Sequence, residues 1–176
     1  IKIGNFETSN KKNLFLIAGP CVIESESHSL MMAEKIATVC QKLKINFVYK
    51  SSFDKANRSS IKSNRGIEIN QAKKIFNKIK STFNCPILTD VHNESQCEFL
   101  SKSESVDILQ IPAFLCRQPD LLISASKTNK IINVKKGQFF NIMLMIKDIE
   151  SKANELLSSY CEAKNGSIKT QVDPLD

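Results

Sequence analysis

Short apolar runs alternate with amphipathic stretches along this chain. Runs typical of buried strands occupy residues 14–18, 47–49, 86–89, 106–111 and 131–134. Apolar residues at spacings of three and four predict helices over 29–43, 67–83, 96–100 and 120–126, the last beginning just after Pro119. Residues 1–6 predict a small hairpin before the first of these strands. Strands that alternate with helices indicate βα units and therefore an α/β fold with a parallel sheet.

Polar or reactive residues stand at or just after the end of every predicted strand. They are Cys21, then Lys50 and Lys55, then Asp90 and His92, then Gln110, and finally Lys135 and Lys136. In a (β/α) barrel the carboxyl ends of all strands face one mouth, whereas a doubly wound sheet gathers ligands only near its switch point. No glycine-rich dinucleotide fingerprint follows any strand. The pattern therefore favours a barrel whose mouth collects these side chains.

The segment 49–60 is the most informative part of the sequence. It contains two lysines, one arginine, one asparagine and four serines directly after an apolar strand. Lysine supplies a point charge and arginine a two-pronged donor, which suits phosphate or carboxylate oxygens. A solvated loop is the alternative, but such a loop would contain turn residues, and this segment has no glycine or proline. We therefore expect a site for a multiply charged anion.

Taken singly, each candidate residue also has an ordinary structural interpretation. Cys21 could be an inert buried thiol, His92 a strand cap, Gln110 a partner for backbone groups, and Lys135 a solvated cation. The joint pattern at the strand ends favours function over these separate alternatives. His28 is expected to be solvated. The remaining cysteines are expected to be structural: Cys40, Cys85, Cys97, Cys116 and Cys161.

Composition bounds the class of protein. At 176 residues and 41% hydrophobic, the chain suits one globular domain, and no apolar run reaches the length of a membrane span. Cysteines without C-x-x-C spacing, and an N-terminus without a signal-peptide pattern, indicate a reducing compartment and hence the cytoplasm. The net charge of +7 comes from dispersed lysines, and with 7% aromatic residues and no Trp it does not favour nucleic acid. A basic protein that handles phosphorylated metabolites fits this composition.

Four motifs, in this order along the chain, resemble one enzyme family. They are Lys55-Ala56-Asn57-Arg58-Ser59-Ser60, Thr89-Asp90-Val91-His92, Gln110-Ile111-Pro112-Ala113-Phe114-Leu115 and Asn133-Val134-Lys135-Lys136-Gly137-Gln138-Phe139. Between about residues 14 and 139 the chain is similar to 3-deoxy-D-manno-octulosonate 8-phosphate synthases (KDO 8-phosphate synthases). The sister 3-deoxy-heptulosonate 7-phosphate synthases share the fold but have a proline-containing basic loop in place of Lys55–Ser60. The resemblance therefore favours the former, and the latter stays the alternative.

The resemblance implies the condensation of phosphoenolpyruvate with D-arabinose 5-phosphate in lipopolysaccharide precursor synthesis. It implies that Lys50, Lys55, Gln110 and Lys135 bind phosphoenolpyruvate. It implies that Asn57, Arg58 and Ser59 bind the pentose phosphate, and that Pro112, Ala113 and Phe114 line the pocket. Lys55, Lys135 and His92 would act at the reacting centre, with Asp90 behind them. Arg117 would reach phosphoenolpyruvate or brace the pocket, and the sequence does not decide between these roles.

The resemblance also implies a cofactor and an oligomer. One branch of the family holds a divalent metal through a cysteine, and Cys21 places this chain with that branch. Thiolate ligation suits zinc, iron(II) or, less comfortably, manganese. Family members are homotetramers, which makes a homotetramer the expected assembly.

The similarity fades after Phe139. We expect residues 1–139 to form the N-terminal part of a (β/α) barrel, an incomplete barrel of about five βα units, because a complete barrel needs about eight strands. Residues 140–176 predict a divergent amphipathic helix to about Tyr160 and then a tail. Three alternatives stay open: a fragment of a normal synthase, a shortened protein completed by partner chains, or a pseudoenzyme that binds phosphoenolpyruvate or phosphosugar without turnover.

Overall fold

The computed structural model describes residues 1–9, 11–56 and 65–137. It divides into two units, residues 1–135 and 136–176, and only Lys136 and Gly137 of the second unit are described. The sheet, the helices and the candidate site described below therefore all lie in the first unit. The helix expected after residue 140 and the predicted boundary at residue 139 lie at or beyond the end of the described part, and both stay predictions.

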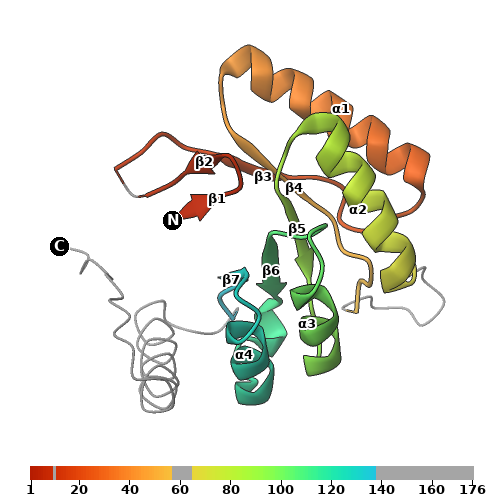
Figure 1. Ribbon diagram of the computed structural model, residues 1–176, viewed down its shortest axis with the longest axis vertical. Coiled ribbons are helices and arrows are strands. Elements are labelled where there is room, and N and C mark those ends of the chain that lie inside the picture. Colours follow the sequence, from red (N-terminus) through yellow and green to blue (C-terminus); the bar gives the residue numbers. More distant parts are fainter. Residues whose placement is uncertain (10, 57–64, 138–176) are drawn as a thin grey trace. The chain divides into compact units, whose positions relative to one another are not determined.

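The first unit is a parallel five-stranded sheet preceded by a hairpin (Figure 1). The hairpin pairs β1 (Lys2–Ile3) with β2 (Phe6–Glu7). The sheet consists of β3 (Leu16–Ala18), β4 (Phe47–Lys50), β5 (Ile87–Asp90), β6 (Ile108–Ile111) and β7 (Ile131–Val134). Its connections carry α1 (Glu26–Leu43), α2 (Ile69–Phe83), α3 (Glu94–Ser101), the 3₁₀ helix η1 (Ala113–Leu115) and α4 (Pro119–Ser126).

The strands lie in the sheet in the same order as in the chain, β3-β4-β5-β6-β7. A doubly wound sheet reverses its strand order at a switch point, whereas a (β/α) barrel always adds the next strand on the same side. The observed order confirms the α/β barrel class, with the five predicted strands present. All carboxyl ends lie along one edge, as the sequence pattern required.

Helix α1 begins earlier than its apolar periodicity indicated. The Ser25 hydroxyl accepts a hydrogen bond from the backbone N–H of His28 at 3.1 Å, so the helix begins at Glu26 rather than near Ser29. His28 consequently lies in the first turn, half-buried, with a buried Nδ1 atom. The expectation that His28 is solvated is wrong, because N-cap chemistry and not hydrophobic spacing sets this end of the helix.

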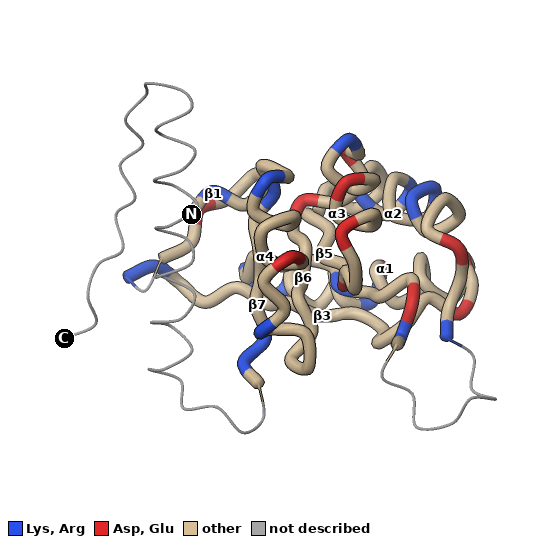
Figure 2. The backbone as a smooth tube through the Cα atoms, turned by 90° about the horizontal axis from the view of Figure 1, so that it is seen from below, with Lys and Arg blue, Asp and Glu red and all other residues tan. Residues whose placement is uncertain are grey.

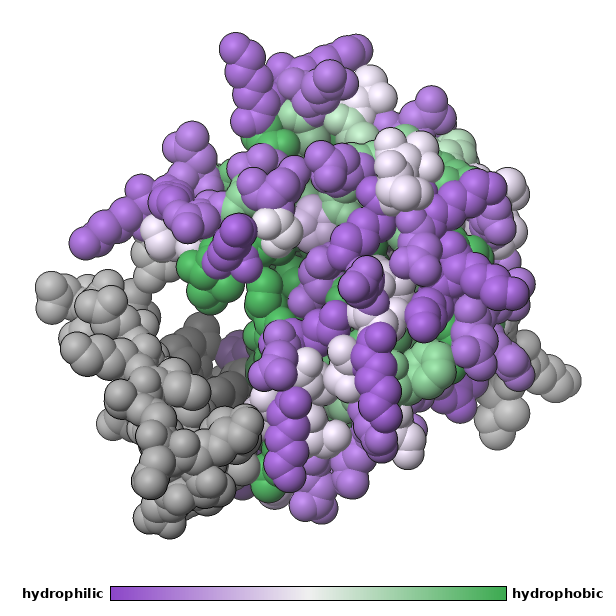
Figure 3. All heavy atoms as spheres, viewed as in Figure 1, coloured by the Kyte–Doolittle hydropathy of each residue, from purple (hydrophilic) through white to green (hydrophobic). Residues whose placement is uncertain are grey.

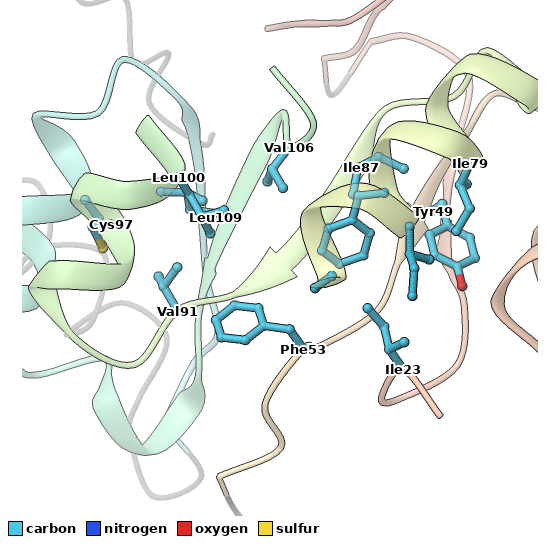
Figure 4. Packing of buried hydrophobic residues seen from close by; sticks show 14 of the residues in the cluster. Ile23, Tyr49, Phe53, Ile79, Ile87, Val91, Cys97, Leu100, Val106 and Leu109 are labelled. Carbon is cyan, nitrogen blue, oxygen red and sulfur yellow. The ribbon is translucent and has the colours of Figure 1, made fainter. Parts of the chain in front are cut away.

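Side chains on the two faces of the sheet form two separate apolar layers. Outward-facing residues such as Tyr49, Ile87 and Leu109 pack beneath the helices, and Figure 4 shows Tyr49 and Ile87 beside Ile79 of α2. The opposite face carries a smaller cluster of Ile3, Val48, Leu88 and Ile108. The hairpin residue Ile3 thus caps the amino-terminal end of this inner layer, and the inner positions nearer the strands' carboxyl ends are polar.

The outer surface is polar and mixed in charge. Figure 2 shows Lys and Arg interspersed with Asp and Glu along the helices and loops. Hydrophilic residues cover most of the face seen in Figure 3, whereas hydrophobic ones reach the surface beside the N-terminal hairpin. Among the described residues, no helix is long and apolar enough to cross a membrane.

Candidate functional site

One register row crosses the carboxyl ends of the strands and consists of polar residues. Asp90 of β5 pairs with Gln110 of β6, and Gln110 pairs with Asn133 of β7. Ser52, which follows β4, lies next to Asp90 and hydrogen-bonds to it. We call Ser52, Asp90, Gln110 and Asn133 the polar row. In a parallel sheet residues of one row share a face, so these side chains form a layer above the apolar one.

Asp90 is the centre of the polar row. Its carboxylate accepts hydrogen bonds from the Ser52 hydroxyl on one side and from the Gln110 side-chain amide on the other. The carboxylate is largely buried, with 15% of its side chain exposed. Sequence reasoning placed Asp90 behind the ligand-binding residues, and these contacts are those of a residue that organises its neighbours.

Lys50 projects from the end of β4 into the same layer. Its ammonium lies 3.3 Å from the Ser52 hydroxyl, 3.5 Å from the Cys21 carbonyl oxygen and 3.8 Å from an Asp90 carboxylate oxygen. About a fifth of the side chain (21%) is exposed, so the cation is partly withdrawn from water yet reachable. Electrostatic attraction to an incoming anion is stronger there than at an open surface.

Gln110 and Asn133 extend the row to the far strand. Asn133 Nδ2 donates to Gln110 Oε1 at 2.9 Å, and Gln110 Nε2 donates to Asp90. Gln110 is 7% exposed. Lys50, Asp90 and Gln110 were predicted to converge, and the structure brings them together.

Ser52 and Asn133 belong to the site but had no role in the sequence prediction. The signal for Asn133 is a polar residue inside the apolar run Ile131–Val134, two residues before Lys135. Ser52 lies two residues after Lys50, so it shares the face of Lys50. Both positions could have been noticed through the period-two rule, but the register that joins them could not.

A close backbone approach fixes the position of Lys50. A Cβ atom added to Gly19 would lie 2.0 Å from the Lys50 carbonyl oxygen. Only glycine allows the chain after β3 to pass this close to the end of β4. Gly19 thereby keeps Cys21 and Lys50 in neighbouring positions.

Asp54 and Lys55, which follow β4, are hydrogen-bonded to Arg65. Arg65 donates from Nε and Nη2 to the two carboxylate oxygens of Asp54, at 2.9 and 2.7 Å, and Lys55 N–H donates to the Arg65 carbonyl at 2.6 Å. The hydrogen bonds that Arg65 donates to Asp54 raise the pKa of Arg65. Lys55 is partly buried. Asn57, Arg58 and Ser59, predicted to bind a sugar phosphate, lie outside the described residues.

His92 stands two residues beyond Asp90, where β5 leads into α3. Its backbone N–H donates to Gln96 Oε1 at 2.7 Å, and its ring meets that of Phe53 edge-on, with centroids 6.4 Å apart. Within the described residues its Nδ1 atom is buried and has no hydrogen-bond partner. The ring is therefore held by packing against Phe53.

The other predicted site residues follow β6 and β7. Pro112 and Ala113 are partly buried, whereas Phe114 is 58% exposed. Lys135 is exposed, and its backbone N–H donates to the Ile111 carbonyl at 3.0 Å. These residues continue from the strands that carry Gln110 and Asn133, and the contacts described here do not join their side chains to the polar row.

Cys21 does not have the burial of a core thiol. It is exposed, whereas Cys40, Cys85, Cys97 and Cys116 are buried, as predicted for structural cysteines. Within residues 1–9, 11–56 and 65–137, however, no group of three His, Cys, Asp or Glu side chains is close enough to hold a metal ion. Cys21 can therefore offer one thiolate, and these residues do not complete a metal site around it.

The arrangement is suited to binding an anion. Lys50 supplies positive charge, and Gln110 supplies an amide whose nitrogen has a second N–H beyond the one given to Asp90. The side chains of Lys50 and Gln110 project from strand ends into a layer that is largely shielded from water. Such fixed donors stabilise phosphate or carboxylate oxygens more than mobile surface lysines do.

Comparison with known proteins gives a consistent result. The sequence model of the DAHP synthetase I family matches residues 2–170. Proteins named 2-dehydro-3-deoxyphosphooctonate aldolase are similar to this chain over 139 residues, with 59% identity in Rickettsia typhi, 57% in Rickettsia prowazekii and 56% in Bartonella tribocorum. Each alignment covers 79% of this chain and 49–50% of the relative, so the chain spans about half the length of the curated relatives it matches.

The sequence match and the fold point the same way. A parallel sheet with strands in chain order, a cation-bearing polar row at the strand ends, and a family match over most of the chain are mutually consistent. The chain therefore belongs to the DAHP synthetase I family.

Proposed function

We propose that this chain carries a substrate-binding half of a synthase that joins phosphoenolpyruvate to D-arabinose 5-phosphate. The products would be 3-deoxy-D-manno-octulosonate 8-phosphate and inorganic phosphate, in lipopolysaccharide precursor synthesis. The supporting observation is the polar row with Lys50 at its edge, in a chain 56–59% identical to proteins named 2-dehydro-3-deoxyphosphooctonate aldolase. That name describes the same eight-carbon keto acid phosphate. It favours this product over the seven-carbon product of the sister enzymes.

Phosphoenolpyruvate carries a carboxylate and a phosphate on three carbons, so its site needs several donors in a small volume. Lys50, beside the row, and Gln110, within it, provide an ammonium and an amide N–H on the two sides of Asp90. Lys55 and Lys135, on the segments that follow β4 and β7, would add charge for the phosphate, as the family resemblance implies. This spacing of cations would offset the mutual repulsion of the two anionic groups.

The pentose phosphate would bind to the segment after β4. Asn57, Arg58 and Ser59 would hold it, with Arg58 toward the phosphate, where a planar guanidinium can make two parallel bonds. The Asp54–Arg65 pair closes the base of this segment. Pro112, Ala113 and Phe114 would line the pocket.

In the reaction, C3 of phosphoenolpyruvate would attack the aldehyde carbon of the sugar, forming the new carbon–carbon bond. Water would add at C2, and the C2–oxygen bond to phosphate would then break and release inorganic phosphate. His92 would orient the water or a reacting oxygen, as the family resemblance implies. Lys55 and Lys135 would stabilise the developing charge near the reacting carbons.

We also propose that Cys21 gives one thiolate to a divalent metal: zinc, iron or manganese. When bound, such an ion would act as a Lewis acid toward the aldehyde oxygen or the water. The other ligands would come from beyond the described residues. Protection of Cys21 against a thiol reagent by added zinc, absent in Cys21→Ser, would support this; equal labelling with and without zinc would refute it.

The assembly and compartment follow from the same proposal. A homo-oligomer, a tetramer as in the family, would be the working form. The enzyme would act in the cytoplasm, where its free cysteines stay reduced. A competing function is a pseudoenzyme that binds the anions without turnover.

Phosphate release from phosphoenolpyruvate by the purified chain tests the proposal. We expect release that requires arabinose 5-phosphate and is lost with a chelator. Binding without release would favour the pseudoenzyme, and absence of both binding and release would overturn the proposed function. Replacement of the pentose phosphate by a four-carbon aldose phosphate, which would give a seven-carbon product, tests the sister activity, which we expect to be slower.

Direct binding of phosphoenolpyruvate gives the matched comparison. Lys50→Ala removes a charged donor and should weaken binding by roughly 10–100-fold, the usual cost of losing a charge-assisted hydrogen bond. Lys74→Ala removes the same charge from an exposed position on α2 and should leave binding unchanged. Equal effects of the two substitutions would mean that only net charge matters.

A further inference from the structure

Asn133 is the polar residue whose role the proposed function leaves open. It lies in the middle of β7, where its neighbours Ile132 and Val134 pack against the outer core. Its side chain instead belongs to the inner layer and donates from Nδ2 to Gln110 Oε1 at 2.9 Å. An amide at an inner strand position that could hold an aliphatic side chain calls for an explanation.

The direction of every hydrogen bond in the polar row follows from Asp90. An ionised carboxylate only accepts, so Ser52 must give its single hydroxyl proton to Asp90 and Gln110 must turn its NH₂ group toward it. The Gln110 carbonyl oxygen then faces the other way, toward β7. There it needs a donor, and Asn133 provides one.

This directionality has a consequence for the ligand. With its carbonyl oxygen turned toward Asn133 of β7 and one N–H given to Asp90, Gln110 keeps its second N–H as the donor that it can offer to a ligand. At the other end of the row, the Ser52 hydroxyl donates its single proton to Asp90, so its oxygen accepts a hydrogen bond from Lys50. The row thus presents donors to an anion although its centre is itself an anion.

We propose that Asn133 is a positioning residue: it holds the Gln110 amide in the orientation that Asp90 sets, so that Gln110 offers an N–H, and not its carbonyl oxygen, to an anionic substrate. This inference rests on the proposed function for the identity of the anion. The orientation of Gln110 itself does not depend on it, which allows the two to be tested apart.

Two substitutions remove the donor in different ways. Asn133→Asp keeps the shape but places an acceptor opposite the Gln110 oxygen, and Asn133→Leu keeps the approximate volume without a polar group or charge. Asn77→Asp makes the same charge change at an exposed position on α2 and serves as the control. A real positioning effect requires that the Leu and Asp variants both differ from the control.

The first readout needs no ligand. NMR of the labelled full chain follows exchange of the Gln110 side-chain amide protons with water. Without the hydrogen bond from Asn133 to its oxygen, the Gln110 amide can more easily turn its N–H groups away from Asp90. Loss of this one neutral hydrogen bond should speed the exchange by about 5–10-fold in both Asn133 variants, whereas Asn77→Asp should leave it unchanged. Unchanged exchange in Asn133→Leu would overturn the proposal, whatever the chain binds.

The second readout is the affinity for phosphoenolpyruvate. We expect both Asn133 variants to bind about 10-fold more weakly than the wild type. The deficit of Asn133→Asp should shrink as the pH falls from about 6 to about 4, toward the ordinary aspartic acid pKa of about 3.9, because the introduced carboxyl group regains a donor when it is protonated, while that of Asn133→Leu should stay constant. A deficit confined to Asn133→Asp and unaffected by pH would mean simple charge repulsion and would refute the positioning role.

The outcomes separate the two claims. If the wild-type chain does not bind phosphoenolpyruvate but amide exchange changes as expected, the proposed function fails and the positioning of Gln110 stands. If phosphoenolpyruvate binds and the Asn133 variants match the wild type in both readouts, the proposed function stands and the positioning role fails.

Discussion

At the scale of single residues, the central question is how a carboxylate comes to lie inside an anion site. Asp90 accepts from Ser52 and Gln110 and lies 3.8 Å from the Lys50 ammonium. A buried charge is costly unless it is paired and hydrogen-bonded, and these three contacts meet that requirement. The carboxylate therefore acts as an organiser of donors, and its negative charge is compensated within the site.

This role predicts the effect of Asp90→Asn. An asparagine has one acceptor oxygen in place of two and puts an NH₂ group opposite Ser52 or Gln110, so the charge-assisted hydrogen bonds are lost and Lys50 loses its counter-ion. We expect the free energy of unfolding to fall by about 1–3 kcal/mol, measured by urea denaturation. Glu34→Gln, at an exposed position on α1, is the control and should change stability by less than about 0.5 kcal/mol. Similar stability for the two variants would contradict the organising role.

Buried thiols predict how stability depends on alkaline pH. Burial raises the pKa of Cys85 from 9.0 to about 11, and that of Cys97 from 9.0 to about 11. Below pH 9 these thiols are protonated in both states, so their contribution to stability is fully present. As the pH rises toward 11 the unfolded thiols ionise first, and the contribution is lost.

Urea denaturation between about pH 8 and pH 10.5 measures this loss. The free energy of unfolding should decrease with pH, and Cys85→Ala and Cys97→Ala should each make that decrease less steep, whatever they do to stability at neutral pH. Val106→Ala, which removes a buried side chain that cannot ionise, should leave the pH dependence as in the wild type. If Cys85→Ala and Cys97→Ala keep the full decrease of stability with pH, the thiols are not its source. Tyr49 then becomes the next candidate, because burial raises its pKa to about 12.

At the scale of elements, apolar runs and helical periodicity predicted the strands and helices because each depends on neighbours a few residues away. The start of α1 was misplaced because a side-chain cap, Ser25, determines it. Lys50, Asp90 and Gln110 were predicted because each follows or ends an apolar run. Ser52 and Asn133 were missed because their roles depend on the stagger between strands, and stagger is a property of the folded sheet.

Gly19 shows how an element's end positions the site. A methyl group there would lie 2.0 Å from the Lys50 carbonyl, so the chain after β3 must move away from β4 if Gly19 becomes Ala. We expect Gly19→Ala to lower the free energy of unfolding by about 2–4 kcal/mol and to weaken anion binding through displacement of Lys50. Urea denaturation and a phosphoenolpyruvate titration measure the two effects.

Gly4→Ala gives the matched comparison for Gly19→Ala. There the added methyl group would meet the Pro86 side chain at 2.8 Å, in a hairpin at the other end of the sheet. We expect a loss of about 1–2 kcal/mol, from the left-handed backbone and this contact, without any change in anion affinity. Equal effects on binding would mean that Gly19 has no special relation to the site.

At the scale of the whole molecule, the polar row reaches from the end of β4 to β7, while β3 and β7 each have one strand partner within the described residues. β3 and the residues just before it are also apolar at their surface: Leu16 and Ile17 of β3 are 41% and 37% exposed, and Leu14, two residues before β3, is 89% exposed. An exposed, apolar edge strand is a template for pairing with another chain. The β3 edge of the sheet is therefore a surface through which the chain can associate with another chain.

We predict that the purified chain self-associates through this edge. Sedimentation velocity should show a sedimentation coefficient that rises with concentration, and Ile17→Lys should reduce that rise, since a charge on an edge strand opposes pairing. Val39→Lys places the same charge on an exposed apolar residue of α1, which is 52% exposed, and should leave association unchanged. If Val39→Lys reduces association as much as Ile17→Lys, the contact is a general consequence of apolar surface. If neither does, the β3 edge is not where the chains meet.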